Sequence, residues 1–172
     1  MDFLELGCIF LAYLIGALNG GILICRIFGV TDPRKRGSGN AGSTNVWRVH
    51  GKLLALLTLL FDGLKGFVPM MLLMTHQAST ATLCLAGIAL FVGHLFPVYF
   101  RFKGGKGVAV TAGISLAVAP VIFGYACMTW VLLLGVTRRV SVASIGAACT
   151  MMLIALSQQT YVWCMVPICL MI

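Results

Sequence analysis

The chain carries very little charge. Charged residues make up 9% of it, only four are Asp or Glu, and the formal net charge is +8. A water-soluble domain needs a charged surface, so this composition excludes a soluble globular protein. The 60% hydrophobic content indicates an all-α integral membrane protein. Eleven of the twelve Lys and Arg residues lie in or beside short loops between apolar spans, and the twelfth, Lys65, lies within a span, which excludes a face that binds nucleic acid.

Sequence signals for metal binding, disulfides and export are also missing. All seven cysteines lie in apolar stretches without a CxxC pair, so we interpret them as small buried apolar side chains and expect no metal site. The N-terminus carries Asp2 and Glu5 where a cleavable signal needs basic residues, so we expect the first apolar span to be retained. Residues 1–172 are enough for a single helical bundle.

The apolar segments predict about seven transmembrane helices in this bundle. The expected segments are 3–25, 52–74, 81–98, 108–117, 120–134, 140–156 and 161–172. We divide the apolar stretch 108–134 near Pro120, because two passes return Arg138 and Arg139 to the cytoplasmic side, where positive residues are favoured. This arrangement places the N-terminus outside and the polar loops in the cytoplasm. The fourth and seventh segments are too short to cross a full bilayer alone.

The first polar motif, GSGNAGSTNVWR at residues 37–48, interrupts the apolar sequence. Its glycines permit a positive φ and close backbone approach, its hydroxyls and amides can donate hydrogen bonds, and its arginine can hold two phosphate oxygens. We predict a binding site for phosphate or a similar anion here. The candidate ligands are Ser38, Asn40, Gly42, Thr44, Asn45 and Arg48. A polar turn that caps the next helix is the alternative interpretation.

The second polar motif, FKGGKGVAV at residues 102–110, opens the next apolar stretch. A helix N-terminus offers unpaired N–H groups and partial positive charge, to which the two lysines add. The candidate anion-binding residues are Lys103, Gly104, Gly105, Lys106 and Gly107. The pattern departs from G-x-x-x-x-G-K-[ST], so nucleotide binding is not supported. A basic flexible turn is the alternative interpretation.

Three ionisable residues lie inside apolar spans or near their ends. Asp62 and Lys65 are three positions apart, so they can meet on one helix face. Intramembrane charges commonly mark function, so we predict that both contact substrate, with a structural ion pair as the alternative. His94 is a candidate base or a donor to phosphate, and a packing residue is the alternative interpretation.

The sequence TRRVSVAS at residues 137–144 supplies a third group of candidates. Arg138, Arg139 and Ser141 could close the anion site from another loop, or they could serve only topology and helix capping. A His followed five residues later by Asp, which common glycerolipid acyltransferases use as base and orienter, is absent. An acyltransferase with this sequence would need another mechanism.

Together these motifs resemble the bacterial acyl-phosphate:glycerol-3-phosphate acyltransferase family, also called PlsY. The matching pieces are SGNAGSTNVWRVHG (38–51), LFDGLKGFVP (60–69), GHLFPVYFRFKGGKGVAV (93–110) and TRRVSVASI (137–145). They occur in the order and at the spacing of the family, over most of the chain. Single pieces would carry little weight, but four in register are highly specific.

The resemblance implies one transmembrane acyltransferase domain over residues 1–172, placed in the bacterial inner membrane. It would transfer an acyl group from acyl phosphate to the 1-hydroxyl of glycerol 3-phosphate and give lysophosphatidic acid, without metal or other cofactor. The implied catalytic residues are Ser38, Arg48 and Lys106, and Ser141 would lie near glycerol 3-phosphate. The implied partners are both substrates, membrane lipids and the soluble enzyme that makes acyl phosphate.

The sequence also departs from the family pattern. Ser43 and Val110 replace the usual Ala and Thr, and the chain stops at Ile172, where family members continue into a basic cytoplasmic tail with a His-Arg-x-Asn-Ile pattern. A truncated or degenerate homologue that binds phosphate or lipid headgroups without turnover is therefore an alternative. A small anion transporter is a weaker alternative, because the polar groups gather at one face and not along the bundle midplane.

Overall fold

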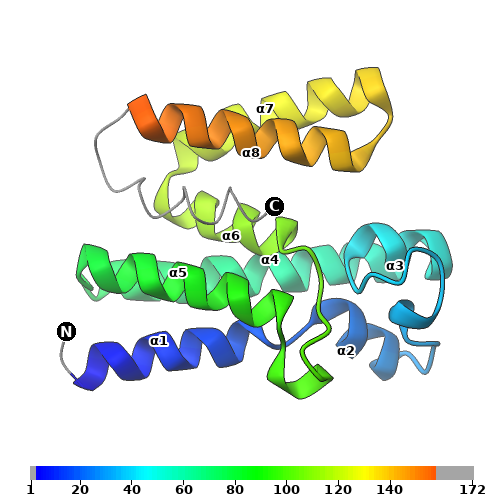
Figure 1. The fold of residues 1–172 in the computed structure, drawn as a ribbon, viewed down its shortest axis with the longest axis horizontal. Coiled ribbons are helices and arrows are strands. Elements are labelled where there is room, and N and C mark those ends of the chain that lie inside the picture. The colour runs from blue at the N-terminus through cyan, green and yellow to red at the C-terminus, as the bar shows by residue number, and fades with distance from the viewer. Residues whose placement is uncertain (1–2, 158–172) are drawn as a thin grey trace.

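The computed structural model describes residues 3–157, and every regular element in this range is helical (Figure 1). The α-helices are α1 (Phe3–Gly16), α2 (Gly20–Ile27), α3 (Ser43–His50), α4 (Lys52–Thr75), α5 (Thr80–Leu95), α6 (Val108–Val118), α7 (Pro120–Thr137) and α8 (Val140–Ser157). Two short 3-10 helices, η1 (Pro33–Lys35) and η2 (Val98–Phe100), lie in the connections. The expected all-α fold is confirmed.

The first apolar span is broken. The sequence predicts one segment over 3–25, but α1 and α2 are separate helices that meet at a bend of 52°. Asn19 starts the second helix, because its Oδ1 accepts a hydrogen bond from the Ile22 N–H at 3.2 Å and so caps the new N-terminus. The break leaves main-chain groups that side chains of α4 then bind.

The division of the stretch 108–134 near Pro120 is confirmed. α6 ends at Val118 and α7 begins at Pro120. Proline suits the first position of a helix, because the N–H it lacks would have no partner there and its φ is already helical. With 11 residues, α6 is about 17 Å long, so it is too short to cross a bilayer core of about 30 Å alone.

Glycines bring the helices of the bundle into close contact. α4 packs along α6, α1 along α5, and α7 along α8. A Cβ at Gly113 of α6 would collide with the Gly63 carbonyl of α4, and a Cβ at Gly66 would collide with the Val110 carbonyl. Small residues commonly allow membrane helices to approach in this way. The α4–α6 contact fixes the start of α6, where the second polar motif lies.

Four helices of the described range are long and apolar enough to cross a membrane, and the bent pair α1–α2 would make a fifth. The expected segment 161–172 lies outside the described residues. The count of seven helices and the outward N-terminus therefore stay predictions. The cysteine interpretation is corrected in part. Cys25 is buried, but Cys127 and Cys149 are exposed on the outer surfaces of α7 and α8, and Cys84 is disulfide-bonded.

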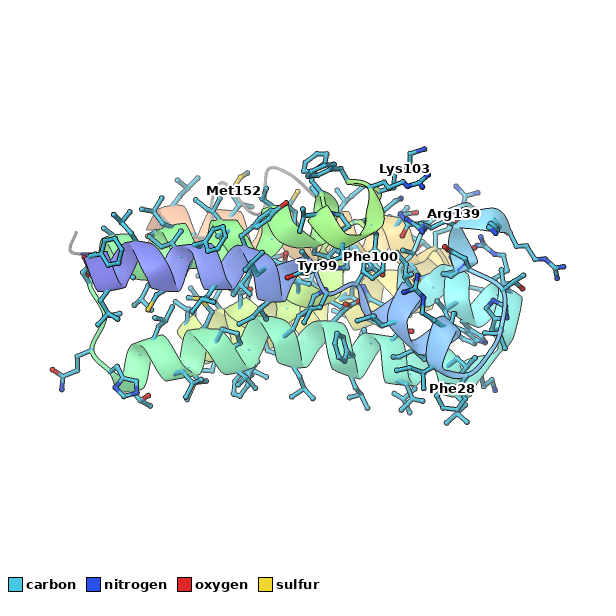
Figure 2. All side chains as sticks on the ribbon, turned by 90° about the horizontal axis from the view of Figure 1, so that it is seen from below. Phe28, Tyr99, Phe100, Lys103, Arg139 and Met152 are labelled. Carbon is cyan, nitrogen blue, oxygen red and sulfur yellow. The ribbon has the colours of Figure 1, made fainter. Side chains whose placement is uncertain are left out.

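The polar connections gather at one end of the bundle. In Figure 1, α2, α3, the α5–α6 connection and the α7–α8 connection lie toward the end opposite the N-terminus and the α4–α5 connection. Figure 2 shows Lys103 and Arg139 at this polar end. The expectation that the basic loops share one side agrees with this arrangement.

Candidate active site

The first polar motif folds around the side chain of Asn45 in α3. This side chain is 2% exposed, and its Nδ2 contacts the carbonyl oxygens of Pro33 (2.8 Å), Asn40 (2.9 Å) and Arg36 (3.1 Å). Its Oδ1 accepts a hydrogen bond from the Ser38 N–H at 2.8 Å. An amide bonded at both ends gives up its capacity for other partners. Asn45 therefore shapes this loop, and its predicted contact with substrate stays a prediction.

The backbone of the motif fits closely around that amide. Gly37 has a φ of 64°, and a Cβ there would collide with Oδ1 of Asn45. Asn40 turns the chain, because its Oδ1 accepts a hydrogen bond from the Gly42 N–H at 2.7 Å. Gly42 then stands as the N-cap of α3. The motif does form a turn before α3, but no side chain makes a capping hydrogen bond to this helix.

Three candidate ligands of the first polar motif remain accessible. The side chains of Ser38, Thr44 and Arg48 are exposed. Thr44 and Arg48 are four residues apart in α3, so they share one face of the helix. The main chain of Ser38 is held by Asn45, which fixes where its hydroxyl can reach. This face can present a hydroxyl and a guanidinium to one anion.

The second polar motif folds back over the end of α5. The Gly104 N–H donates to the Leu95 carbonyl at 3.1 Å, and the Gly105 N–H donates to the His94 carbonyl at 3.2 Å. A Cβ at Gly104 would collide with the His94 carbonyl, and a Cβ at Gly105 would collide with Nε2 of the His94 ring. Both glycines are needed for this close approach. Their N–H groups satisfy carbonyls at the end of α5 and are not free to bind an anion here.

The remaining anion-binding groups of this motif surround the start of α6. Gly107 is the N-cap of α6 with a φ of 80°, a conformation that favours glycine. The first turn of α6 presents N–H groups without partners inside the helix. Lys103 and Lys106 are exposed beside it. Two ammonium groups and one helix N-terminus are thus available to a phosphate.

Asp62, Lys65 and His94 form a buried polar cluster below this motif, with exposed fractions of 1%, 6% and 3%. The Lys65 ammonium lies 2.8 Å from Asp62 Oδ1 and 2.9 Å from His94 Nδ1. It also donates to the Leu18 carbonyl at 2.7 Å, and Asp62 Oδ1 accepts from the Gly20 N–H at 3.1 Å. The cluster therefore joins the α1–α2 break to α4 and α5. With Lys65 as donor to Nδ1, the ring proton belongs on Nε2.

The burial of this cluster bears on the roles predicted for its members. The meeting of Asp62 and Lys65 on one helix face is confirmed by their 2.8 Å contact. All three side chains are buried and bonded to one another or to the main chain, so the geometry favours the structural alternative. Direct contact of Asp62, Lys65 or His94 with substrate stays a prediction.

The third group of candidates lies at the α7–α8 connection. Arg138 is the C-cap of α7 with a φ of 52°, and Ser141 lies in the first turn of α8. Both side chains are exposed, as is that of Arg139, which lies at the same end of the bundle as Lys103 (Figure 2). The structure brings the third group to the polar end. A contact of Ser141 with substrate stays a prediction.

Sequence reasoning did not place Arg34 in the site. Its guanidinium bonds to Asp32 and also donates to the carbonyls of Phe100 and Lys103, 66 and 69 residues away. No local pattern reveals such distant contacts. The local signal is the Asp-Pro-Arg sequence, in which Asp32 caps η1 by accepting from the Arg34 N–H at 2.9 Å.

The exposed charge at the polar end is positive. The exposed basic side chains that belong to the three groups of candidates are Arg48, Lys103, Lys106, Arg138 and Arg139. Further exposed basic side chains, to which no substrate contact is assigned, are Arg26, Lys35, Arg36, Lys52 and Arg101. The carboxylate of Asp32 is paired with Arg34, and this hydrogen bond is the main reason why the pKa of Asp32 is lowered. Such a surface suits a ligand with several negative charges. Within residues 3–157, no group of three or more His, Cys, Asp or Glu side chains is placed to hold a metal ion.

Known proteins with related sequences share one described activity. The family model described as glycerol-3-phosphate acyltransferase matches residues 6–172. The glycerol-3-phosphate acyltransferase of Methylobacillus flagellatus is 47% identical over 137 residues, which cover 80% of this chain and 70% of that protein. The enzyme of the same name from Pseudomonas syringae pv. syringae is 48% identical over 136 residues, which cover 79% and 71%.

Two solved structures share the fold. One is the crystal structure of PlsY (YgiH), an integral membrane glycerol 3-phosphate acyltransferase, in its glycerol 3-phosphate form. It matches 97% of this chain and 85% of its own, with a TM-score of 0.91 and 34% identity. The lysophosphatidic acid form matches with a TM-score of 0.87 and 32% identity, over the same shares of the two chains. The chain is therefore an integral membrane protein that belongs to the glycerol-3-phosphate acyltransferase family.

Proposed function

We infer that this protein is a glycerol-3-phosphate acyltransferase, which acylates glycerol 3-phosphate to lysophosphatidic acid in phospholipid synthesis. One observation carries the inference: the fold matches the glycerol 3-phosphate form of a solved enzyme over 97% of this chain. That enzyme also has a lysophosphatidic acid form, which corresponds to the product. The positive end of the bundle supplies the charge that a phosphate-bearing substrate requires.

Acyl phosphate is the proposed donor. The 1-hydroxyl oxygen of glycerol 3-phosphate attacks the acyl carbon, the bond from this carbon to the phosphate oxygen breaks, and inorganic phosphate leaves. The hydroxyl proton passes to an oxygen of a substrate phosphate. The donor is already activated, so the reaction does not require a strong side-chain base. This agrees with the burial of His94, whose Nδ1 is occupied by Lys65.

Electrostatic positioning is the main task of the site. Two phosphate-bearing substrates repel each other, so positive groups must hold both at a reacting distance. Arg48 in α3 and Lys106 in the connection before α6 are both exposed at the polar end. We assign one substrate phosphate to each. This assignment is supported by the position of the two cations at different helices. Arg48 lies in α3, whose N-cap is Gly42, and Lys106 directly precedes Gly107, the N-cap of α6.

The remaining proposed contacts come from groups beside these two cations. Thr44 presents a hydroxyl on the same face of α3 as Arg48, and Ser38 has an exposed hydroxyl in the same motif. Lys103 adds a second exposed ammonium to the motif that contains Lys106. Ser141 would approach glycerol 3-phosphate from the start of α8. Each of these groups can donate a hydrogen bond to a phosphate oxygen. No metal or other cofactor takes part in this scheme.

The acyl chains of the donor and the product require an apolar environment, which the membrane supplies. The acyl chain of the donor and of the product would lie along the outer, apolar faces of the bundle. We propose the bacterial inner membrane, with the polar end in the cytoplasm, where glycerol 3-phosphate is available. The soluble enzyme that makes acyl phosphate is the proposed partner for delivery at that end.

The donor assignment is tested with the purified full chain in detergent micelles. Labelled glycerol 3-phosphate is incubated with either an acyl phosphate or the matching acyl thioester. We expect lysophosphatidic acid and inorganic phosphate in equal amounts with acyl phosphate, and no product with the thioester. Product from the thioester alone would overturn the donor. No product from either, with glycerol 3-phosphate still bound, would favour the non-catalytic homologue.

The anion-transporter alternative gains no support from the described bundle. Asp62 and Lys65 are its candidate path residues, but they are buried and bonded to each other, with a separation of 2.8 Å. A path for an anion needs positive groups that remain available along the midplane. The available positive groups lie at one end instead.

A further inference from the structure

Arg34 links the two polar motifs. Its Nη1 donates to the Phe100 carbonyl and to the Lys103 carbonyl, both at 3.1 Å. Its Nη2 lies 2.7 Å from Asp32 Oδ2, and its Nε lies 3.1 Å from Asp32 Oδ1. One planar guanidinium therefore bonds to a carboxylate on one edge and to two carbonyls of a distant loop on the other. Only arginine offers this set of donors.

The aromatic ring of Phe100 completes the link. It is 7% exposed, and the guanidinium carbons of Arg34 and Arg26 each lie 6.0 Å from its centroid. Cations at this distance from a ring are attracted to it. The chain on the second-motif side of the link is thus held by hydrogen bonds from the Arg34 side chain to two main-chain carbonyls and by a buried ring near two cations.

The other side of the link leads directly into the first polar motif. Arg34 lies in η1, and the carbonyls of Pro33 and Arg36 on either side of it accept from Asn45. The same Asn45 amide fixes the main chain of Ser38. A movement of Arg34 would therefore displace the Ser38 loop relative to the Lys103 loop.

Arg34 is an unsuitable ligand for phosphate, unlike the exposed arginines around it. Its charge is balanced by Asp32 at 2.7 Å, and the pKa of that carboxyl is lowered chiefly by its hydrogen bond with Arg34. Its donors are directed to protein oxygens at both edges. Any contribution of Arg34 to the reaction must therefore be indirect, through the positions of the loop segments to which it is hydrogen-bonded.

We propose that Arg34 is a positioning residue that sets the distance between the first and second polar motifs, and so between the two substrate phosphates. The proposal rests on the proposed function, because the two motifs need a fixed separation only if both hold a reactant. A misplacement of about 1 Å in a reacting pair can cost about 100-fold in rate. The link acts on the joint alignment of the substrates more than on the binding of either one.

The first test does not depend on activity. Hydrogen exchange of the full chain in micelles is compared for wild type, Arg34→Lys and the control Lys35→Gln. Lysine keeps the positive charge but cannot bond to a carboxylate and two carbonyls in one plane. We expect faster exchange in Arg34→Lys at both loops, residues 36–42 and 100–107, and wild-type exchange in the control, which removes a neighbouring exposed charge. Unchanged exchange at 100–107 in Arg34→Lys would overturn the link.

The second test separates positioning from binding. We expect Arg34→Lys to lower kcat by about 10- to 100-fold, while the KM values for glycerol 3-phosphate and acyl phosphate change by less than about threefold. Lys35→Gln should keep the wild-type kcat. A raised KM with an unchanged kcat would assign Arg34 to substrate binding and overturn the proposal. An inactive wild type that still shows faster exchange in Arg34→Lys would refute the proposed function and leave the link established.

Discussion

The ammonium nitrogen of Lys65 lies 2.9 Å from Nδ1 of His94, inside the bundle. Through this contact, the ion pair of α4 reaches the residue directly below the second polar motif. The His94 carbonyl accepts a hydrogen bond from the Gly105 N–H at 3.2 Å, and its ring leaves no room for a Cβ at Gly105. The position of the loop that carries Lys106 therefore depends on the buried cluster.

Removing one charge of the cluster is expected to destabilise the protein. Lys65→Met leaves the Asp62 carboxylate buried without its cation, which should lower the free energy of unfolding by about 3–5 kcal/mol. Asp62→Asn combined with Lys65→Met removes both charges and should recover most of this loss. Denaturant unfolding in micelles measures both. A double variant as unstable as Lys65→Met alone would contradict the pairing.

The close approach at Gly105 gives a second prediction. Gly105→Ala should lower kcat by about 10- to 100-fold, because the new methyl group meets the His94 ring and displaces the loop. Gly124→Ala in α7 is the matched control, since nothing lies within 4 Å of a Cβ there. Steady-state kinetics on both variants check this. Equal turnover in the two variants would show that the loop tolerates the displacement.

Asn45 offers a prediction on stability. Asn45→Asp keeps an acceptor for the Ser38 N–H but turns a second oxygen toward carbonyls that now receive the Nδ2 hydrogens. Loss of a buried donor should cost about 1–3 kcal/mol, or more because the new group is charged. Asn40→Asp is the control for stability, since Asn40 Oδ1 acts only as an acceptor for the Gly42 N–H. Thermal unfolding in micelles should separate the two variants.

The ion pair of Asp32 and Arg34 predicts a dependence on pH. The folded-state pKa of Asp32 is lowered from 3.8, mainly by the hydrogen bond with Arg34. A lowered pKa means that the pair stabilises the loop above the ordinary carboxyl value and that this contribution is lost as the pH falls through the lowered value. The resistance of the segment around η1 to proteolysis should therefore fall in acid.

Asp32→Asn is the control for this pH effect, because it removes the titrating group. The variant should be less protected than wild type at neutral pH and should lose the difference in acid. A constant difference between wild type and variant from neutral pH to below the carboxyl range would contradict the role of the pair.

Sequence features predicted those parts of the fold that depend on interactions between residues close in the sequence. Pro120 marks the start of α7 because proline fits the first helical position, and the spacing of Asp62 and Lys65 places them on one face. The break before α2 is less evident, since the stretch 3–25 is apolar almost throughout. Its signal is Asn19 followed by two glycines, which suits a helix cap but is easily read as a polar position within one span.

The distant contacts of the site could not be predicted in this way. His94 joins Lys65 across 29 residues, and Arg34 reaches Lys103 across 69. These pairs depend on how α4, α5 and the polar loops pack together, and no residue pattern specifies that packing. For the same reason, the sequence shows that Asn45 is polar and could bind a ligand. It does not show that the Asn45 amide is already hydrogen-bonded to main-chain groups of the loop.

The central claim is that Arg48 and Lys106 hold the two substrate phosphates during acyl transfer to glycerol 3-phosphate. Formation of lysophosphatidic acid from acyl phosphate is the most direct test, measured for the wild type, Arg48→Ala and Lys52→Gln at matched protein concentrations. The account predicts turnover by the wild type, loss of at least about 100-fold in Arg48→Ala, and wild-type turnover in Lys52→Gln, which removes an exposed cation at the start of α4. Full turnover by Arg48→Ala, or none by the wild type, would contradict it.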